Sequence, residues 1–305
     1  MRAQQALPVG HKKQMSYYKL LGLEREPFST SPDPFFLYMT REHDLALTNI
    51  LIELRLRRGL SVILGDIGTG KTSLSRKLVR ELNERSDFIF HVILNPSFEN
   101  EKEFLYSLLK NFQIPFPEQL THASAPEMRD AFEKFLLEKN LRENKTVIVI
   151  IDEAQTLSLD TLESLRILLN YETNEYKLIQ IVLLGQLELF SKMTVLPNFY
   201  DRICFKFTLN PLGLQETKEL ILFRLRQAGY NSREPLFSEE AMSEVYYFSK
   251  GYPRSVIRIC HKCLRALVMS KDKTIVDQQL AVEVIGKDSD SQWQKTTTLP
   301  LKENF

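Results

Sequence analysis

The sequence has no excess of charge of either sign and no long apolar run. Its 305 residues carry 40 basic and 39 acidic side chains, a formal net charge of +1, so no overall field indicates a nucleic-acid or membrane-surface partner. The longest apolar runs, residues 147–151 and 181–184, have the length of strands and not the roughly 20 residues of a membrane span. We therefore expect no transmembrane segment.

Cysteine and glycine are also scarce. Three cysteines exclude a disulfide scaffold and fit a reducing cytoplasm. Eleven glycines and thirteen prolines exclude collagen-like and low-complexity classes. Residues 1–15 contain no apolar core, so they do not form a signal peptide and we expect a flexible leader. The composition indicates a soluble, cytoplasmic protein of about two domains.

Apolar segments alternate with amphipathic stretches in the first two thirds of the chain, which predicts an α/β fold with a parallel sheet. We expect a helix over residues 41–58, with Thr40 as its N-cap, and another over 73–82. Several of the apolar segments lack polar alternation, as strands buried on both faces do. The expected strands are residues 60–64, 88–94, 146–151, 179–184 and 205–209.

Beyond Pro211 the pattern predicts helices only, over residues 214–228, 239–250, 254–270 and 277–285. The polar, aperiodic end of the chain is typical of disorder. We therefore expect a leader over residues 1–15, an α/β core with its N-terminal segment over 16–212, a helical lid over 213–286 and a disordered tail over 287–305.

The segment after the first expected strand fits the pattern G-x-x-x-x-G-K-[ST] of a phosphate-binding loop. Glycines let backbone N–H groups surround phosphate oxygens, and the N-terminus of the following helix adds a favourable dipole. Lys71 would neutralise phosphate charge, and Thr72 would bind Mg²⁺. The predicted nucleotide-binding residues are Gly65, Asp66, Ile67, Gly68, Thr69, Gly70, Lys71, Thr72 and Ser73.

Two carboxylates, Asp152 and Glu153, follow the apolar strand 147–151. Carboxylates at the end of a buried strand are costly unless they meet a cation or solvent. We expect Asp152 to bind Mg²⁺ and Glu153 to polarise the attacking water. Together with the phosphate-binding loop, this pair predicts binding of ATP or GTP with Mg²⁺.

Two further polar residues have alternative interpretations. Gln186 closes the strand 179–185 and either reaches the γ-phosphate and its water or bonds to a neighbouring loop. Arg202 precedes the last strand and either completes the site of a neighbouring subunit or forms an ion pair within its own chain.

The helix expected over residues 254–270 has a basic face opposite an apolar stripe. Arg254, in its first turn, could contact the nucleotide. The basic residues behind it, Arg258 to Arg265, form either a phosphate-binding surface or, as the simpler interpretation, a solvated face. Cys260 and Cys263 look like half of a zinc site, but no second pair has suitable spacing. Burial of Cys260 in the apolar stripe is favoured.

An ordered series of motifs over residues 16–285 resembles the ExeA/GspA-type AAA+ ATPases. The series departs from the usual family pattern at Leu187, where proline is common, and at Asp66, where glutamate is common. The matching residues are Tyr17–Leu23, Pro27-Phe28, Pro32-Asp33-Pro34, Leu37-Tyr38, His43, Asp152-Glu153-Ala154-Gln155, Leu162–Arg166, Asn170–Thr173, Lys177-Leu178, Gly185–Leu189, Asp201–Ile203 and Gly251–Arg254.

The resemblance implies a P-loop AAA+ core with a five-stranded parallel sheet, a small all-helical lid, and ATP and Mg²⁺ as cofactors. It also implies that Gln186 is sensor 1, Arg202 an arginine finger and Arg254 sensor 2. The adenine would lie near the N-terminal segment, where Pro27, Phe28 and Tyr38 are candidates. An arginine finger acting in trans requires a ring or filament of this chain with itself.

The resemblance leaves two interpretations of the biological role. The first is an ATP-driven switch or motor in secretion or envelope-machine assembly, acting with an unidentified, membrane-associated partner. Full-length members of the family usually add a transmembrane helix and a periplasmic domain, neither of which is in this sequence. The second is a DNA-binding ATPase resembling the TnsC/MuB transposition regulators, which the basic face and Arg55, Arg57 and Arg58 favour.

Overall fold

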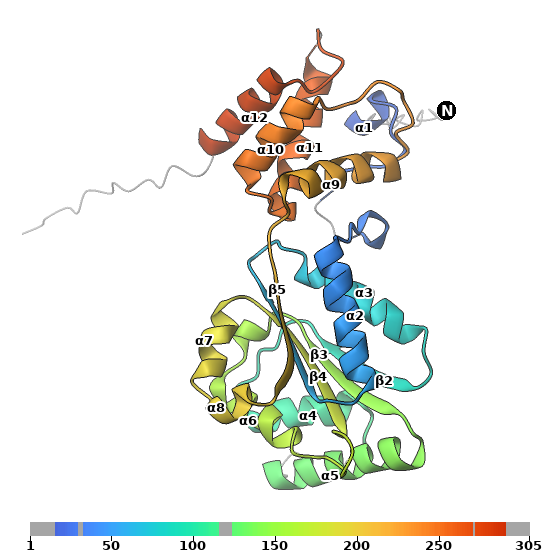
Figure 1. Ribbon diagram of the computed structural model, residues 1–305, viewed down its shortest axis with the longest axis vertical. Coiled ribbons are helices and arrows are strands. Elements are labelled where there is room, and N and C mark those ends of the chain that lie inside the picture. Colours follow the sequence, from blue (N-terminus) through green and yellow to red (C-terminus); the bar gives the residue numbers. More distant parts are fainter. Residues whose placement is uncertain (1–15, 30–32, 116–123, 271, 291–305) are drawn as a thin grey trace, which may run out of the picture. The chain divides into compact units, whose positions relative to one another are not determined.

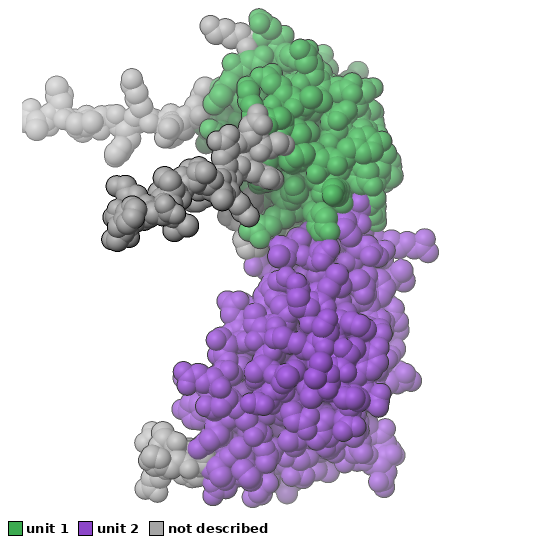
Figure 2. All heavy atoms as spheres, turned by 90° about the vertical axis from the view of Figure 1, so that its left-hand side faces the viewer, with its two compact units in different colours: residues 1–38, 213–305 green, residues 39–212 purple. Residues whose placement is uncertain are grey.

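The chain is divided into two compact units (Figure 2). The computed structural model describes residues 16–29, 33–115, 124–270 and 272–290. Residues 39–212 form one unit, which we call the α/β unit, and residues 1–38 with 213–305 form the other, which we call the helical unit. The expected leader, residues 1–15, lies outside the described residues.

The α/β unit is built on a five-stranded parallel sheet with the order β2-β3-β4-β1-β5. This confirms the predicted fold class. The second strand ends one residue earlier than expected, and the fifth begins two residues earlier. The strands are β1 (Leu60–Gly65), β2 (Phe88–Ile93), β3 (Thr146–Ile151), β4 (Ile179–Gly185) and β5 (Ile203–Leu209).

Helices cover both faces of this sheet (Figure 1). Thr40 caps α2 as predicted, because its hydroxyl accepts the backbone N–H of His43, and this helix ends three residues before the expected Arg58. The helical elements are α2 (Arg41–Arg55), α3 (Lys71–Asn83), α4 (Glu101–Asn111), α5 (Ala125–Leu137), the π-helical turn η3 (Glu138–Arg142), the short η4 (Ala154–Thr156), α6 (Leu159–Leu168), α7 (Glu188–Thr194) and α8 (Pro197–Tyr200).

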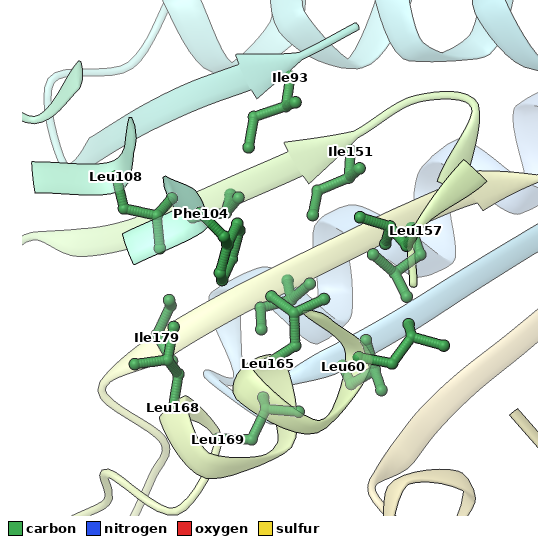
Figure 3. Packing of buried hydrophobic residues seen from close by; sticks show 14 of the residues in the cluster. Leu60, Ile93, Phe104, Leu108, Ile151, Leu157, Leu165, Leu168, Leu169 and Ile179 are labelled. Atoms are coloured by element: carbon green, nitrogen blue, oxygen red, sulfur yellow. The ribbon is translucent and has the colours of Figure 1, made fainter. Parts of the chain in front are cut away.

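The core lies in two layers, one on each side of the sheet. Val147, Val149 and Ile151 of β3 pack toward α4, α5 and α6, part of which Figure 3 shows, whereas Ile148 and Ile150 pack toward α2 and α3. Alternate residues of a strand point to opposite faces, so the uninterrupted apolar run fills both layers. Each fully buried aliphatic side chain contributes about 1.5–3 kcal/mol, which holds the carboxyl ends of the strands in a fixed arrangement.

The strand order decides which residues can meet. Because β4 lies between β1 and β3, the end of β4 separates the loop after β1 from the carboxylates after β3. All strands are parallel, so Gly65, Ile151 and Gly185 end at the same edge of the sheet. Ligands of open α/β sheets bind at this edge.

The helical unit contains six helical segments in its described part. Ser238 caps α10, because its hydroxyl accepts a 3.1 Å hydrogen bond from the backbone N–H of Ala241. The last helix continues to Asp290, so residues 287–290, which we expected to be disordered, are helical, and the tail from residue 291 lies outside the described residues. The segments are α1 (Tyr17–Leu20), η1 (Pro34–Phe36), α9 (Leu214–Gln227), α10 (Glu239–Ser249), α11 (Pro253–Met269) and α12 (Gln278–Asp290).

The segment before α2 belongs to the helical unit, whereas the sequence led us to attach it to the α/β core. A buried arginine explains the difference. Arg224 of α9 donates from Nε to the carbonyl of Pro27 (2.6 Å) and from Nη2 to that of Ser29 (3.1 Å). Its guanidinium also lies over the Phe36 ring. These contacts join residues distant in sequence, which local patterns do not encode.

Candidate functional site

The loop after β1 has the backbone geometry that its glycines predict. Gly68 and Gly70 have φ values of 86° and 104°, in the left-handed region that only glycine adopts freely. Gly70 is the N-cap of α3, so the loop leads directly into a helix N-terminus. Unpaired backbone N–H groups and the helix dipole favour an anion there.

The loop is also folded closely on itself. A Cβ at Gly65 would lie 2.7 Å from Oγ1 of Thr69 and 2.9 Å from the carbonyl of Leu209, so only glycine fits. The Thr69 hydroxyl donates to the carbonyl of Asp66 at 2.9 Å. The predicted loop residues therefore form one compact turn, although the Ile67 side chain is 63% exposed and contributes to this turn only through its backbone.

Lys71 is buried against this turn. Its ammonium group donates to the carbonyls of Gly65 (2.7 Å) and Asp66 (2.9 Å). Burial lowers the pKa of the Lys71 amine, and the nearby carboxylates of Glu153 and Asp152 act in the opposite direction. The Lys71 ammonium thus places a positive charge at the loop, and the nearby carboxylates place negative charge that suits a cation.

Asp152 and Thr72 are in direct contact. The carboxylate of Asp152, which is 2% exposed, accepts a hydrogen bond from the Thr72 hydroxyl. It also accepts the backbone N–H of Glu153 at 2.9 Å. Burial raises the pKa of Asp152, and these two hydrogen bonds partly offset that effect. The two residues predicted to bind Mg²⁺ are thus brought together.

Glu153 and Gln186 are brought together as well. Glu153 has φ 55° and ψ 35°, a left-handed conformation that is uncommon for residues other than glycine. Its Oε2 accepts a hydrogen bond from Nε2 of Gln186 at 3.4 Å. The backbone N–H of Gln186 donates to the side chain of Gln155.

Gln155 is a site residue that the sequence did not single out. Its Nε2 donates to Oε2 of Glu153 at 2.6 Å, and its Oε1 accepts the backbone N–H of Gln186 at 3.0 Å. Lys192 of α7 donates to the backbone carbonyl of Gln155 at 2.6 Å. In the sequence, only its position in the motif Asp152–Gln155 indicates that Gln155 could belong to the site. A motif does not show which groups the side-chain amide contacts.

Arg202 does not join these residues. It precedes β5, whose first residue, Ile203, pairs with Leu60 at the start of β1, whereas Gly65 pairs with Leu209. At about 3.3 Å per strand residue, Arg202 lies roughly 17 Å or more from the loop of its own chain. Its positive charge lowers the pKa of Glu172, after the stronger effect of Lys177, but it forms no salt bridge in the described parts of the chain.

The other two predicted nucleotide-binding residues belong to the helical unit. Arg254 is exposed in the first turn of α11. Phe28 is 1% exposed and packs edge-to-face on Phe237, so it forms part of the core of this unit. Their role toward a nucleotide stays a prediction.

The basic face of α11 is largely engaged within its own unit. Arg258 forms an ion pair at 3.1 Å with Asp288 of α12, and Lys262 forms another with the same carboxylate. His261 contacts the Tyr17 hydroxyl and the Glu26 carboxylate, each at 3.0 Å. Arg258, His261 and Lys262 therefore have partners within the helical unit, while the side chains of Arg258 and Lys262 stay partly exposed.

The two cysteines of α11 lie inside the helical unit. Burial raises the pKa of the Cys263 thiol to about 12 and that of Cys260 well above its ordinary value. Protonated thiols are poor metal ligands, and the burial of Cys260 agrees with the apolar stripe on which the sequence places it.

The chain is similar to a known protein family, to a characterised protein and to solved structures. Residues 54–193 match the family described as AAA domain. General secretion pathway protein A of Aeromonas hydrophila is 35% identical over 290 residues, which is 93% of this chain and 51% of that protein. The chain thus spans about half the length of this relative. Within the described residues, no helix is long and apolar enough to cross a membrane.

Solved structures share the fold at low sequence identity. The ORC2 protein of Aeropyrum pernix aligns with a TM-score of 0.61 and 18% identity, covering 87% of this chain and 72% of that chain. Cdc6p of Pyrobaculum aerophilum aligns with a TM-score of 0.62 and 19% identity, covering 82% and 67%. Residues 54–193 therefore match an AAA domain, and the chain resembles the ExeA/GspA-type AAA+ ATPases along nearly its whole length.

Proposed function

We propose that the chain binds ATP in the loop formed by residues 65–73 and hydrolyses it with Mg²⁺. The observation that supports this most directly is the grouping of one buried cation and two carboxylates at a single sheet edge. The Lys71 ammonium interacts electrostatically with Glu153 and Asp152, and the Thr72 hydroxyl bonds to Asp152. This is the set of groups that phosphoryl transfer requires in P-loop proteins.

The residues fit a magnesium ion. Thr72 and Asp152 supply a hydroxyl and a carboxylate, the hard oxygen donors that Mg²⁺ prefers, and they already lie in contact. The described residues contain no group of three or more His, Cys, Asp or Glu that could hold a metal ion, which suits an ion that takes its other ligands from phosphate and water. When bound, Mg²⁺ would neutralise charge on the β- and γ-phosphates.

The remaining chemistry belongs to the chain itself. Lys71 would exchange its bonds to the loop carbonyls for bonds to phosphate oxygens. Glu153 would orient a water molecule and accept its proton, while Gln186, bonded to the same carboxylate, would hold the water in line with the γ-phosphate. Arg254 and Phe28 stay candidate contacts from the helical unit.

Substitutions of Lys71 and Glu153 test this function. We expect Lys71→Ala to abolish binding of a fluorescent ATP analogue, and Glu153→Gln to retain binding while phosphate release falls at least about 100-fold. Lys77→Ala, which removes a lysine of α3 paired with Glu81, is the matched control and should behave as wild type. Addition of EDTA should stop turnover, and Mg²⁺ should restore it. Unchanged turnover in Glu153→Gln would overturn the assignment.

We also propose that Arg202 acts on the site of a neighbouring subunit. Its position at the amino end of β5, away from its own loop, supports assembly of the chain into a ring or filament. Mixing the inactive variants Arg202→Ala and Glu153→Gln should restore part of the activity, since Glu153→Gln subunits supply Arg202 to intact sites. If no mixing ratio restores activity, Arg202 does not act in trans.

For the biological role we propose ATP-driven assembly of a secretion or envelope machine with a membrane-associated partner. The support is the similarity to General secretion pathway protein A, of which this chain matches about half. The DNA-binding alternative depends on basic residues that are partly engaged, since Arg258 pairs with Asp288 and Arg57 bonds to Thr146. ATP-dependent, salt-sensitive binding to duplex DNA would favour that alternative.

A further inference from the structure

His43 is a buried histidine that none of the proposed catalytic or binding roles uses. It is the third residue of α2 and is 3% exposed. Its ring bridges the start of α2 and the phosphate-binding loop, because Nδ1 lies 2.7 Å from Oγ1 of Thr40 and Nε2 lies 3.2 Å from the carbonyl oxygen of Thr69. All of these residues belong to the α/β unit.

The chemistry of the partners determines where the ring carries its proton. The carbonyl oxygen of Thr69 can only accept, so Nε2 must be a donor. The hydroxyl of Thr40 can donate to Nδ1 while accepting the backbone N–H of His43, a contact of 3.3 Å. The neutral ring with its hydrogen on Nε2 therefore satisfies both contacts of the imidazole.

The bond to Thr69 fixes the orientation of the next N–H group in the loop. In a planar trans peptide the carbonyl and the N–H point in opposite directions, and the described residues contain no cis peptide. When the carbonyl of Thr69 points to His43, the N–H of Gly70 must point away from α2. Backbone N–H groups of such loops are the groups that hold phosphate oxygens.

The packing of His43 against Gly70 supports the same orientation of the Thr69–Gly70 peptide. Gly70 has φ 104°, and a Cβ there would lie 2.5 Å from Nε2 of His43. The imidazole thus occupies the space next to the glycine that a side chain would need. The hydrogen bond from His43 to Thr69 therefore acts on a peptide that is packed directly against the imidazole.

We propose that His43 is a positioning residue for the phosphate-binding loop, which holds the Thr69–Gly70 peptide so that the Gly70 N–H is presented to a nucleotide phosphate. This inference rests on the proposed nucleotide binding. It predicts that loss of the Nε2 donor weakens the binding of ATP and ADP, with a higher KM and little change in kcat at saturating ATP.

Two amide substitutions of His43 show whether nucleotide binding depends on the Nε2 hydrogen-bond donor or on the shape of the imidazole ring. A glutamine amide reaches the place of Nε2, whereas an asparagine amide reaches only the place of Nδ1. We expect His43→Asn to weaken the binding of fluorescent ATP and ADP analogues about 10-fold, and His43→Gln to stay within about threefold of wild type. Melting temperatures of both variants check that they are folded.

A second variant leaves the ring in place. Thr40→Val removes the hydroxyl that orients the imidazole and should weaken nucleotide binding about threefold, whereas Thr40→Ser should restore it. If His43→Asn does not fold, the comparison of Thr40→Val with Thr40→Ser still tests the role of His43.

The controls separate the two proposals. If wild type binds no nucleotide, or binds it as weakly as Lys71→Ala, the proposed function fails. If wild type binds and Lys71→Ala does not, equal affinities of His43→Asn and His43→Gln, or of Thr40→Val and Thr40→Ser, overturn the role of His43 alone.

Discussion

The side-chain amide of Gln155 donates to the carboxylate of Glu153 at 2.6 Å, while its carbonyl oxygen accepts the backbone N–H of Gln186 at 3.0 Å. One amide thus connects the proposed catalytic carboxylate with the end of the neighbouring strand. The orientation of that amide is fixed, because the N–H of Gln186 can bond only to its oxygen. Both bonds to Glu153 fall on Oε2.

We predict that Gln155→Met, which keeps the length of the side chain and removes the amide, lowers turnover about 10-fold and leaves ATP affinity unchanged. The physical reason is that Glu153 loses one of the two donors that orient it. The measurement is phosphate release beside nucleotide binding. In a Glu153→Gln background the same substitution should have little further effect, since coupled residues are not additive. Full additivity would show that Gln155 acts elsewhere.

A pH dependence is expected from the buried thiols of α11. Because the pKa of Cys263 is raised to about 12 in the folded chain and that of Cys260 is raised well above its ordinary value of 9.0, the unfolded chain releases these protons first. Their contribution to stability is therefore complete below about pH 9 and is lost as the pH rises toward 12, by at most about 1.4 kcal/mol per pH unit for each group.

The measurement is urea unfolding with a reductant at several values between pH 8 and pH 10.5. We expect the double variant Cys260→Ala and Cys263→Ala to lose less stability over this range than wild type. Cys204→Ser changes an exposed cysteine and should keep the wild-type slope. Parallel slopes in all three proteins would contradict the prediction.

Arg224→Met should loosen the N-terminal segment. The change removes the donors to the carbonyls of Pro27 and Ser29, and buried acceptors without partners cost about 1–3 kcal/mol. Trypsin should then cleave at Lys19 and Arg25 faster than in wild type. Arg226→Met, on the exposed side of the same helix, is the control and should change neither stability nor cleavage.

Asp288→Asn should weaken the packing of α12 on α11. The carboxylate is 1% exposed and pairs with Arg258 and Lys262, whose side chains are partly exposed, so we expect a loss of about 1–3 kcal/mol. Thermal unfolding measures it. Glu283→Gln, which removes an exposed carboxylate of α12 paired with Lys287, should change stability by less than about 0.5 kcal/mol.

The sequence was sufficient to predict the sheet and most of the candidate site because these features are encoded locally. The apolar run of β3 is followed directly by Asp152 and Glu153, and the glycines around Lys71 determine the loop. The meeting of Gln186 with Glu153 could be anticipated because parallel strands end at one edge of the sheet.

The contacts of Gln155, His43 and Arg224 could not be predicted because each depends on the folded backbone. Gln155 contacts Glu153 across a left-handed turn, and the periodicity of the sequence does not predict this turn. His43 meets Thr69 across 26 residues, and Arg224 meets Pro27 across 197. Such pairs are determined by the packing of whole elements and not by the sequence around either residue.

The backbone at position 153 limits which residues evolution or design can place there. With φ 55° and ψ 35°, glycine and asparagine are the residues that adopt the conformation most easily, and valine or isoleucine would be strained by about 1–3 kcal/mol. Glutamate is not the residue that this turn favours. The chain accordingly gives up some folding stability to keep a carboxylate there, and variants selected for stability alone should tend to lose it.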